Sequence, residues 1–201
     1  MQNQNLKLGF LASKNGSSMR AIIEAVRAGE LAAEPLLAVS NNRAAGALDF
    51  AREQGLAALV IPTQADPDAA DARLCEAMEA AGVDLIVLSG YLRHLGPRTL
   101  QRYRNRVINI HPGALPQFGG EGMYGRRVHE AVIAAGASQT GITIHAVDEI
   151  YDHGPVIARR TVEVAPGETV DSLEARITGL EPAFFVETLQ KIVAGELSLP
   201  A

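Results

Sequence analysis

The segment Asp84-Leu-Ile-Val-Leu-Ser-Gly90 decides the fold class of this chain of 201 residues. Its four consecutive apolar residues, Leu85–Leu88, stand between polar and turn-forming residues. A short apolar run without alternation is typical of a strand that is covered on both faces, as strands inside a parallel sheet are. We therefore expect Leu85–Leu88 to be a central strand with helices on both sides of its sheet.

The residues before this strand alternate between strand-like and helix-like patterns. The predicted strands are Leu6–Leu11, Leu36–Ser40 and Leu59–Ile61, and the predicted helices are Ser17–Ala28, capped by its serines, Ala44–Gln54 and Pro67–Ala81. Strands that alternate with helices at this spacing indicate βαβ units, a parallel sheet and right-handed crossovers. Ligands of such sheets bind at the carboxyl ends of the strands.

The residues after this strand have a different pattern, with a long glycine-rich loop. The predicted elements are a strand at Val107–Ile110, a loop at Gln117–Gly125, a helix at Arg126–Ala135, strands at Gly141–Ala146 and near Val156–Val164, and a helix at Val170–Ala194. No linker of low complexity separates the two halves. We predict an α/β fold with a doubly wound, mostly parallel sheet in a single domain, residues 1–201, with halves of about 1–100 and 101–201.

The composition is that of an ordinary globular protein. Apolar residues make up 47% of the chain and charged residues 20%, so nothing indicates a fibrous, disordered or membrane-spanning protein. The formal net charge of −5 argues against non-specific nucleic-acid binding, which needs a basic surface. We expect small-molecule partners, no nucleic acid and no membrane, and a monomer or homodimer.

The cysteine content and the first residues indicate the compartment. Cys75 is the single cysteine, so no internal disulfide is possible, and its apolar neighbours favour a core or surface role over a catalytic one. Met1–Asn5 is polar and lacks the charged and apolar regions of a signal peptide. We expect a cytoplasmic protein.

The turn after the first strand, Ser13-Lys-Asn-Gly-Ser-Ser18, opens a helix. Backbone N–H groups at a helix N-terminus, two hydroxyls and a lysine could hold a phosphate. The turn matches neither the Walker pattern nor the three-glycine dinucleotide pattern. A well-capped turn without a ligand explains the residues equally well.

The strand end Asn109-Ile-His111-Pro112 places Asn109 and His111 on one side of the strand. Both side chains can donate hydrogen bonds toward one point, which suits an oxyanion developing on a carbonyl carbon. Histidine can also exchange a proton near neutral pH. The alternative is a buried histidine bonded to backbone, with Asn109 holding a loop.

The segment His145-Ala-Val-Asp-Glu-Ile-Tyr-Asp152-His-Gly-Pro155 gathers ionisable groups between two strands. Asp152 could pair with His111, orienting its ring and raising its pKa. His111, His145 and Asp152 could instead bind a metal, although no metal-binding motif is present. The third possibility is a solvated acidic turn.

Taken together, these residues resemble the folate-dependent formyltransferase family, from Leu8 to about Leu189. The strongest similarity is the ordered set Asn109-Ile-His111-Pro112, Leu115-Pro116, Gly141-Ile-Thr-Ile-His145 and Asp152-x-Gly154-Pro155. The first turn resembles the family's phosphate-binding turn, and Leu88-Ser-Gly-Tyr-Leu-Arg-His-Leu95 is similar to its folate-side strand end. The resemblance therefore implies a phosphate-binding N-terminal half and a folate-binding, catalytic C-terminal half.

The resemblance also implies a role for individual residues. Asn109 and His111 would hold the oxyanion, Asp152 would pair with His111 and manage protons, and His145 would support them. The implied folate-binding residues are Tyr91, Leu92, Arg93, Leu95, Val147, Asp148, Glu149 and Ile150. The implied substrate and phosphate residues are Lys14, Asn15, Gly16, Ser17, Ser18 and, at the glycinamide end, Glu181.

The implied activity is formyl transfer from 10-formyltetrahydrofolate, as co-substrate, to the amine of glycinamide ribonucleotide in purine biosynthesis. The chemistry needs positioning, oxyanion stabilisation and proton transfer, and we expect no metal. One alternative is the same transfer to another amine, of an amino sugar nucleotide or of hydroxylated ornithine. Others are a metal-dependent hydrolase and a non-catalytic nucleotide-binding module.

Two features depart from the family's pattern. Lys14 stands where the family usually has glycine, and Ser18 where it has asparagine. Lys14 adds a positive charge that could strengthen anion binding. The loop Gln117–Gly125 is longer than in many relatives and predicts either a mobile lid over the substrate or a surface insertion.

Overall fold

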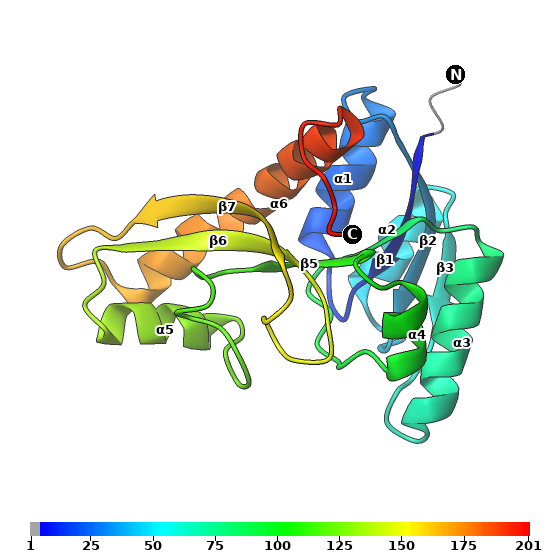
Figure 1. Ribbon diagram of the computed structural model, residues 1–201, viewed down its shortest axis with the longest axis horizontal. Coiled ribbons are helices and arrows are strands. Elements are labelled where there is room, and N and C mark those ends of the chain that lie inside the picture. Colours follow the sequence, from blue (N-terminus) through cyan, green and yellow to red (C-terminus); the bar gives the residue numbers. More distant parts are fainter. Residues whose placement is uncertain (1–4) are drawn as a thin grey trace.

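The sheet organises the computed structural model, which describes residues 5–201 (Figure 1). Within these residues seven strands form one sheet in the order β3-β2-β1-β4-β5-β6-β7. They are β1 (Leu6–Leu11), β2 (Ala33–Ser40), β3 (Ala57–Val60), β4 (Leu85–Leu88), β5 (Val107–His111), β6 (Gln139–Ala146) and β7 (Val156–Glu163). Strands β3, β2, β1, β4 and β5 are parallel, and β6 and β7 extend the sheet antiparallel. The predicted doubly wound, mostly parallel sheet is confirmed.

Helices cover both faces of the sheet (Figure 1). In the described part of the chain they are α1 (Ser17–Arg27), α2 (Gly46–Glu53), α3 (Pro67–Ala80), α4 (Pro97–Arg102), α5 (Arg126–Ala134) and α6 (Val170–Val193). The larger core cluster contains buried residues of α1, α2, α5 and α6, and the smaller one those of α3 and α4. Two apolar layers on one sheet are the arrangement expected of a doubly wound fold.

Strand β4 shows why the apolar run at Leu85–Leu88 predicted a central strand. All four of its residues are buried. Leu85 and Val87 belong to the larger core cluster, whereas Ile86 and Leu88 belong to the smaller one. Because successive side chains point to opposite faces, a strand between two helical layers needs apolar residues at every position.

The start of α1 differs from the prediction. Gly16, in the left-handed region at φ 63°, is the N-cap, and no side chain makes a capping hydrogen bond. The expectation that serines cap this helix was therefore wrong. A Cβ at Gly16 would lie 3.1 Å from the Cβ of Ala47, and the left-handed backbone favours glycine.

Helix α4 was not predicted. Its first amides are capped by Asp71 of α3, which accepts hydrogen bonds from the backbone N–H groups of Arg98, at 2.8 Å, and Thr99, at 3.1 Å. The hydroxyl of Thr99 also donates to Asp71, at 2.5 Å.

Strands β2 and β3 also begin earlier than predicted, because β2 pairs with β1 from the register Leu6↔Ala33 onward.

Two smaller expectations complete the description. Cys75, for which the sequence left a core or a surface position open, is buried in the core. The interpretation of Met1–Asn5 concerns residues that, except for Asn5, lie outside the described part of the chain. Across residues 5–201, no helix is both long enough and apolar enough to cross a membrane.

Candidate active site

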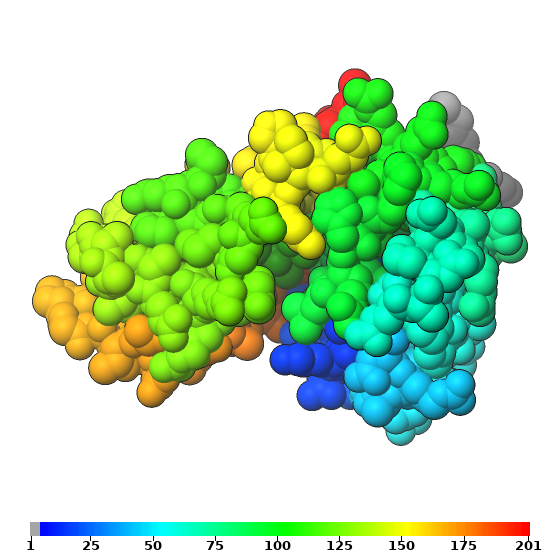
Figure 2. Space-filling model, turned by 90° about the horizontal axis from the view of Figure 1, so that it is seen from below, coloured from blue at the N-terminus to red at the C-terminus, as the bar shows by residue number. Residues whose placement is uncertain are grey.

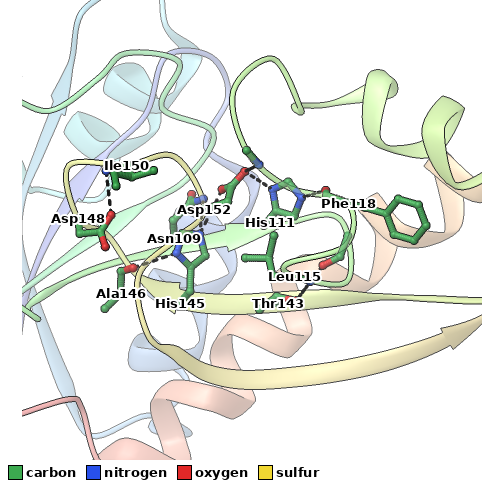
Figure 3. A network of polar contacts seen from close by, with 12 residues as sticks. Asn109, His111, Leu115, Phe118, Thr143, His145, Ala146, Asp148, Ile150 and Asp152 are labelled. Carbon is green, nitrogen blue, oxygen red and sulfur yellow. Dashed lines mark hydrogen bonds and ion pairs between the residues drawn. The ribbon is translucent and has the colours of Figure 1, made fainter.

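Strands β5 and β6 bring four predicted residues together at the carboxyl end of β5 (Figure 3). Asn109 and His111 lie on β5, and the antiparallel register places His145 of β6 opposite Asn109. Asp152 reaches them from the loop between β6 and β7. Asn109 and His111 therefore lie beside a cross-strand partner and a loop carboxylate, as the resemblance implied.

Asp152 lies between the two imidazole rings. Its Oδ2 is 3.4 Å from Nδ1 of His111, and its Oδ1 is 3.5 Å from Nε2 of His145. The carboxamide nitrogen of Asn109 lies 3.3 Å from Nε2 of His145. The His111 side chain is 3% exposed and that of Asp152 10%, so the group is screened from water. Buried charges of this kind interact strongly.

The burial of His111 opposes the effect of Asp152 on its pKa. Burial lowers the pKa of His111 below its usual value, although the Asp152 carboxylate and the Phe118 carbonyl act to raise it. Pairing with Asp152 thus acts on the pKa of His111 in the expected direction, but desolvation of the ring outweighs it, so the net pKa is lowered.

Asp152 remains ionised in this environment. Burial acts to raise its pKa, but hydrogen bonding from His145, the charge of His111 and the N–H of Gly120 outweigh it, so the pKa of Asp152 is lowered. Asp152 also has a backbone φ of 57°, which is uncommon for a residue with a side chain. Such conformations are typical of functional sites.

The loop Gln117–Gly125 supplies two contacts that sequence reasoning missed. Nε2 of His111 donates a hydrogen bond to the carbonyl of Phe118, at 2.6 Å. The N–H of Gly120 donates to Oδ2 of Asp152, at 3.0 Å. Both loop partners are backbone atoms, so the only available signal was the position of glycines directly after the catalytic strand.

Thr143 holds the turn that follows His111 (Figure 3). It lies opposite His111 on β6 and is fully buried. Its hydroxyl donates to the carbonyl of Gly113, at 2.8 Å, and accepts from the N–H of Leu115, at 3.3 Å. Thr143 lies in a quoted motif, but nothing in its neighbours indicated this contact.

The predicted phosphate residues cluster at the start of α1 but differ in accessibility. Lys14, Asn15 and Ser17 are exposed, whereas Ser18 is buried. One hydrogen bond ties this turn to α1. Nε of Arg20 donates to the carbonyl of Asn15, at 2.8 Å. An anion could therefore approach Lys14 and Ser17 from solvent.

Ser13 links this turn to the folate-side loop, the predicted folate-binding segment that follows β4 as far as Leu95. Its hydroxyl donates to Oδ1 of Asn41, at 2.6 Å, and accepts from the N–H of Leu92, at 2.8 Å. The N–H of Ser13 donates to the carbonyl of Gly90. The two predicted substrate regions are thus joined by protein hydrogen bonds.

A cavity of about 270 Å³ adjoins the folate-side loop. Three predicted folate residues, Tyr91, Leu95 and Glu149, contribute to its wall, which is otherwise formed by Val39, Ile61, Thr63, Pro67, Asp68, Ala70, Asp71, Leu74, His94, Gly96, Pro97 and Leu100. Burial raises the pKa of Tyr91 to about 12, so its hydroxyl stays protonated. The cavity is near the lower end of the sizes usual for small-molecule sites, about 300–1,000 Å³.

The remaining predicted folate residues lie on the two loops that flank this cavity. Leu92 and Ile150 are large exposed apolar side chains, Arg93 is exposed, and Val147 packs on the smaller core cluster. Asp148 accepts from the N–H of Ile150, at 2.9 Å. Figure 2 shows the yellow loop between β6 and β7 between the lobe of α5 and the rest of the protein, beside a cleft.

His94 joins these two loops and was missed as a site residue, although it stands inside the quoted motif. Its Nε2 lies 3.2 Å from the carbonyl of Glu149, and its ring meets that of Tyr151 edge-on at 5.1 Å between centroids. Edge-to-face rings attract each other.

Glu181 lies on α6 and is largely buried. Burial raises its pKa to about 7. No hydrogen bond or ion pair among the described residues joins it to Asn109, His111, His145 or Asp152.

The possible metal site has unsuitable donors. Within residues 5–201, no three or more His, Cys, Asp or Glu side chains are arranged to hold a metal ion. Nδ1 of His145 lies 2.9 Å from the carbonyl of Ala146, and Nε2 of His111 points to Phe118.

The comparisons with known proteins define the class of this chain. It belongs to the formyl transferase family, whose model matches residues 6–189. The resemblance inferred from the sequence is confirmed.

Named relatives narrow the similarity further. The chain is 36% identical over 188 residues to the chloroplastic phosphoribosylglycinamide formyltransferase of Vigna unguiculata, covering 92% of this chain and 60% of that protein. It is 31% identical to glycinamide ribonucleotide transformylase 1 of Symbiobacterium toebii, with a TM-score of 0.88 over 100% of this chain and 93% of that one. It is also 31% identical to the trifunctional purine biosynthetic protein adenosine-3 of Bos taurus, over 99% of this chain and 19% of that protein. The chain thus spans less than two thirds of the plant relative's length.

Proposed function

We propose that this protein transfers the formyl group of 10-formyltetrahydrofolate to the amine of glycinamide ribonucleotide, a step of purine biosynthesis. The observation that supports this most directly is the buried group of Asn109, His111, His145 and Asp152 at the carboxyl end of β5. Proteins named for this reaction are similar over nearly the whole chain.

The chemistry follows from the groups present. The amine nitrogen attacks the formyl carbon, and the carbonyl electrons move to oxygen to give a tetrahedral oxyanion. The bond from carbon to the folate nitrogen then breaks, while one proton leaves the attacking nitrogen and one reaches the folate nitrogen. The carboxamide of Asn109 can donate to the oxyanion, and the His111–Asp152 pair can accept and return a proton.

We place the two substrates at the two regions that Ser13 joins, the start of α1 and the segment Leu88–Leu95. The ribonucleotide phosphate would meet the start of α1, at Lys14 and Ser17, because exposed N–H groups at a helix N-terminus attract anions. The pteridine of the folate would use the cavity beside Tyr91 and Leu95, whose apolar walls suit a flat ring system. Glu181 is proposed for the glycinamide end.

The finer aspects of this proposal rest on the sequence. We propose a cytoplasmic enzyme, because the single cysteine excludes an internal disulfide. We also propose a monomer or homodimer without a metal. The reaction as written needs only groups that the described residues contain.

The test is formyl transfer from a 10-formylfolate analogue to glycinamide ribonucleotide, followed by the release of deformylated folate. The wild type is compared with His111→Ala and Asp152→Asn, and with His153→Ala as matched control. His153 is an exposed histidine in the loop of Asp152, 66% accessible, and pairs only with Asp148. We expect turnover that requires the ribonucleotide and falls strongly in the first two variants.

Other outcomes separate the alternatives. Folate binding without transfer to glycinamide ribonucleotide would retain the reaction class and direct the search to other amines. Full turnover in both His111→Ala and Asp152→Asn would contradict the proposed catalytic group.

A further inference from the structure

The glycine-rich loop divides into an inner and an outer part. Phe118 is 4% exposed and belongs to the larger core cluster, whereas Glu121, Tyr124 and Gly125 are exposed. The inner part, Phe118–Gly120, makes both backbone contacts with the catalytic pair. A mobile lid over the whole length of the loop does not fit this anchoring, because Phe118, near its start, is packed in the core.

The carbonyl of Phe118 determines which nitrogen of His111 holds a proton. A carbonyl oxygen only accepts, so Nε2, at 2.6 Å, must be the donor. The other nitrogen, Nδ1, faces the Asp152 carboxylate at 3.4 Å. In the neutral ring Nδ1 therefore has the free lone pair, and it is the nitrogen that gains a proton when the ring becomes charged.

Gly119 makes this arrangement possible through the close approach of its backbone. A Cβ at Gly119 would overlap the side chain of Leu115 and lie 3.1 Å from Cβ and 3.4 Å from Oδ2 of Asp152. Its neighbour Gly120 has a φ of 104°, a conformation that side chains rarely allow. Only glycine at position 119 lets the loop backbone reach Asp152 without moving it.

We propose that the backbone from Phe118 to Gly120 is the positioning element of the His111–Asp152 pair, and that Nδ1 of His111 is the nitrogen that exchanges the proton. This proposal rests on the proposed function for its catalytic meaning. It makes Gly119 a positioning residue that acts through His111 and Asp152.

The surroundings of His111 determine how the pair titrates. Asp152 faces the ring from the loop after β6, His145 from β6 and His129 from α5. Burial lowers the pKa of His111, whereas Asp152 and the Phe118 carbonyl act to raise it. Weakening the loop contacts removes one effect that raises the pKa, so the acidic limb of the rate profile should move to lower pH.

The first experiment uses the wild-type chain without substrates, with ¹⁵N-labelled histidine rings followed by NMR as a function of pH. The His111 signals are assigned by their loss in His111→Asn. We expect a protonated Nε2 throughout and titration at Nδ1. A neutral ring with its proton on Nδ1 would overturn the proposal, whatever the enzyme's substrate proves to be.

The second experiment tests Gly119→Ala. We expect a turnover roughly 100-fold lower, as for other small displacements of catalytic groups, with both KM values little changed. The ring shifts of His111 and the pH profile should change with it. Wild-type ring shifts and pH profile in this variant would overturn the role of Gly119.

The matched control is Gly122→Ala, in the outer part of the same loop, where the φ of 81° strains the loop but a Cβ would meet only Nη1 of Arg127, at 3.9 Å, and neither His111 nor Asp152. We expect wild-type ring shifts and pH profile. If Gly119→Ala does not fold, Phe118→Leu loosens the buried anchor and retains the carbonyl, and it should show the same changes to a smaller degree. Absence of turnover in the wild type, with the expected ring shifts, would reject the proposed function alone.

Discussion

The catalytic group and the first turn are both built at carboxyl ends of strands, but their environments differ. Asn109, His111 and Asp152 are held by partners from β6 and from the glycine-rich loop Gln117–Gly125. Lys14 and Ser17 are exposed, and Ser13 of the same turn is bonded to Asn41 and Leu92 in neighbouring loops. Under the proposed function, bond rearrangement uses groups that are fixed before substrate binds, whereas anion binding uses accessible donors.

The largest effect is expected in the buried group. Asn109→Ala removes a proposed oxyanion donor and should lower turnover by about 100- to 1,000-fold, with little change in the KM for the ribonucleotide. Steady-state kinetics with both substrates measure this. A raised KM with unchanged turnover would assign Asn109 to binding and would remove the contrast between the two regions.

Glu181 tests how burial changes the pKa of a carboxyl group outside the proposed catalytic group. Its folded pKa of about 7 is raised above the usual 4.5, so its contribution to stability is full below pH 4.5 and is lost as the pH rises through 7. Glu181→Gln should therefore raise the free energy of unfolding relative to wild type above pH 7, by at most ~3 kcal/mol. Urea unfolding at pH 5 and pH 8 measures the difference.

The same experiment can contradict the burial of Glu181. A stability difference between Glu181→Gln and wild type that stays constant from pH 5 to pH 8 would show a carboxyl group with an ordinary pKa. The control is Gln190→Glu, the reverse exchange on the same helix. Its free energy of unfolding should show no comparable gain over wild type above pH 7.

A smaller effect is expected at the open first turn. Lys14→Ala should raise the KM for the ribonucleotide several-fold, because an exposed charge pair contributes about 0.2–1 kcal/mol, and leave turnover unchanged. Added salt should reduce the difference between variant and wild type. An unchanged KM at low salt would show that Lys14 does not meet the phosphate, and Lys7→Ala, a lysine on β1, is the control.

The smallest effect is expected at His153. Its Nδ1 lies 2.9 Å from Oδ2 of Asp148, and both side chains are accessible. His153→Ala should change the free energy of unfolding by less than about 1 kcal/mol and leave turnover near that of the wild type. A loss of activity like that of Asn109→Ala would add His153, in the loop between β6 and β7, to the proposed catalytic group.

Local patterns explain which parts of the fold were predictable. Leu85–Leu88 was recognisable because burial on two faces requires apolar residues in succession, a property of consecutive positions. Helix α4 was not, because its capping carboxylate, Asp71, lies 28 residues away from Thr99 in sequence. The cap at Gly16 was missed because the adjacent serines are the usual capping residues.

The candidate site shows the same limit. Asn109, His111, His145 and Asp152 were predicted because side chains of known chemistry stand in a specific order. The contacts of Phe118 and Gly120 were not, because they use backbone atoms that every residue has. The lowered pKa of His111 depends on burial, which is a property of the whole fold.

Helix α6 has a consequence for how the chain can be divided. It contacts α1, α5, β6 and β7, and Gln190 donates to the carbonyl of Glu30, at 2.9 Å, while Glu187 pairs with Arg160 of β7 (Figure 1). The helix belongs to the second half of the chain and also packs on α1 of the first half. A cut near residue 100 would expose the apolar surface of both pieces, so the two halves should denature together as one cooperative unit and regain structure only as a complementing pair.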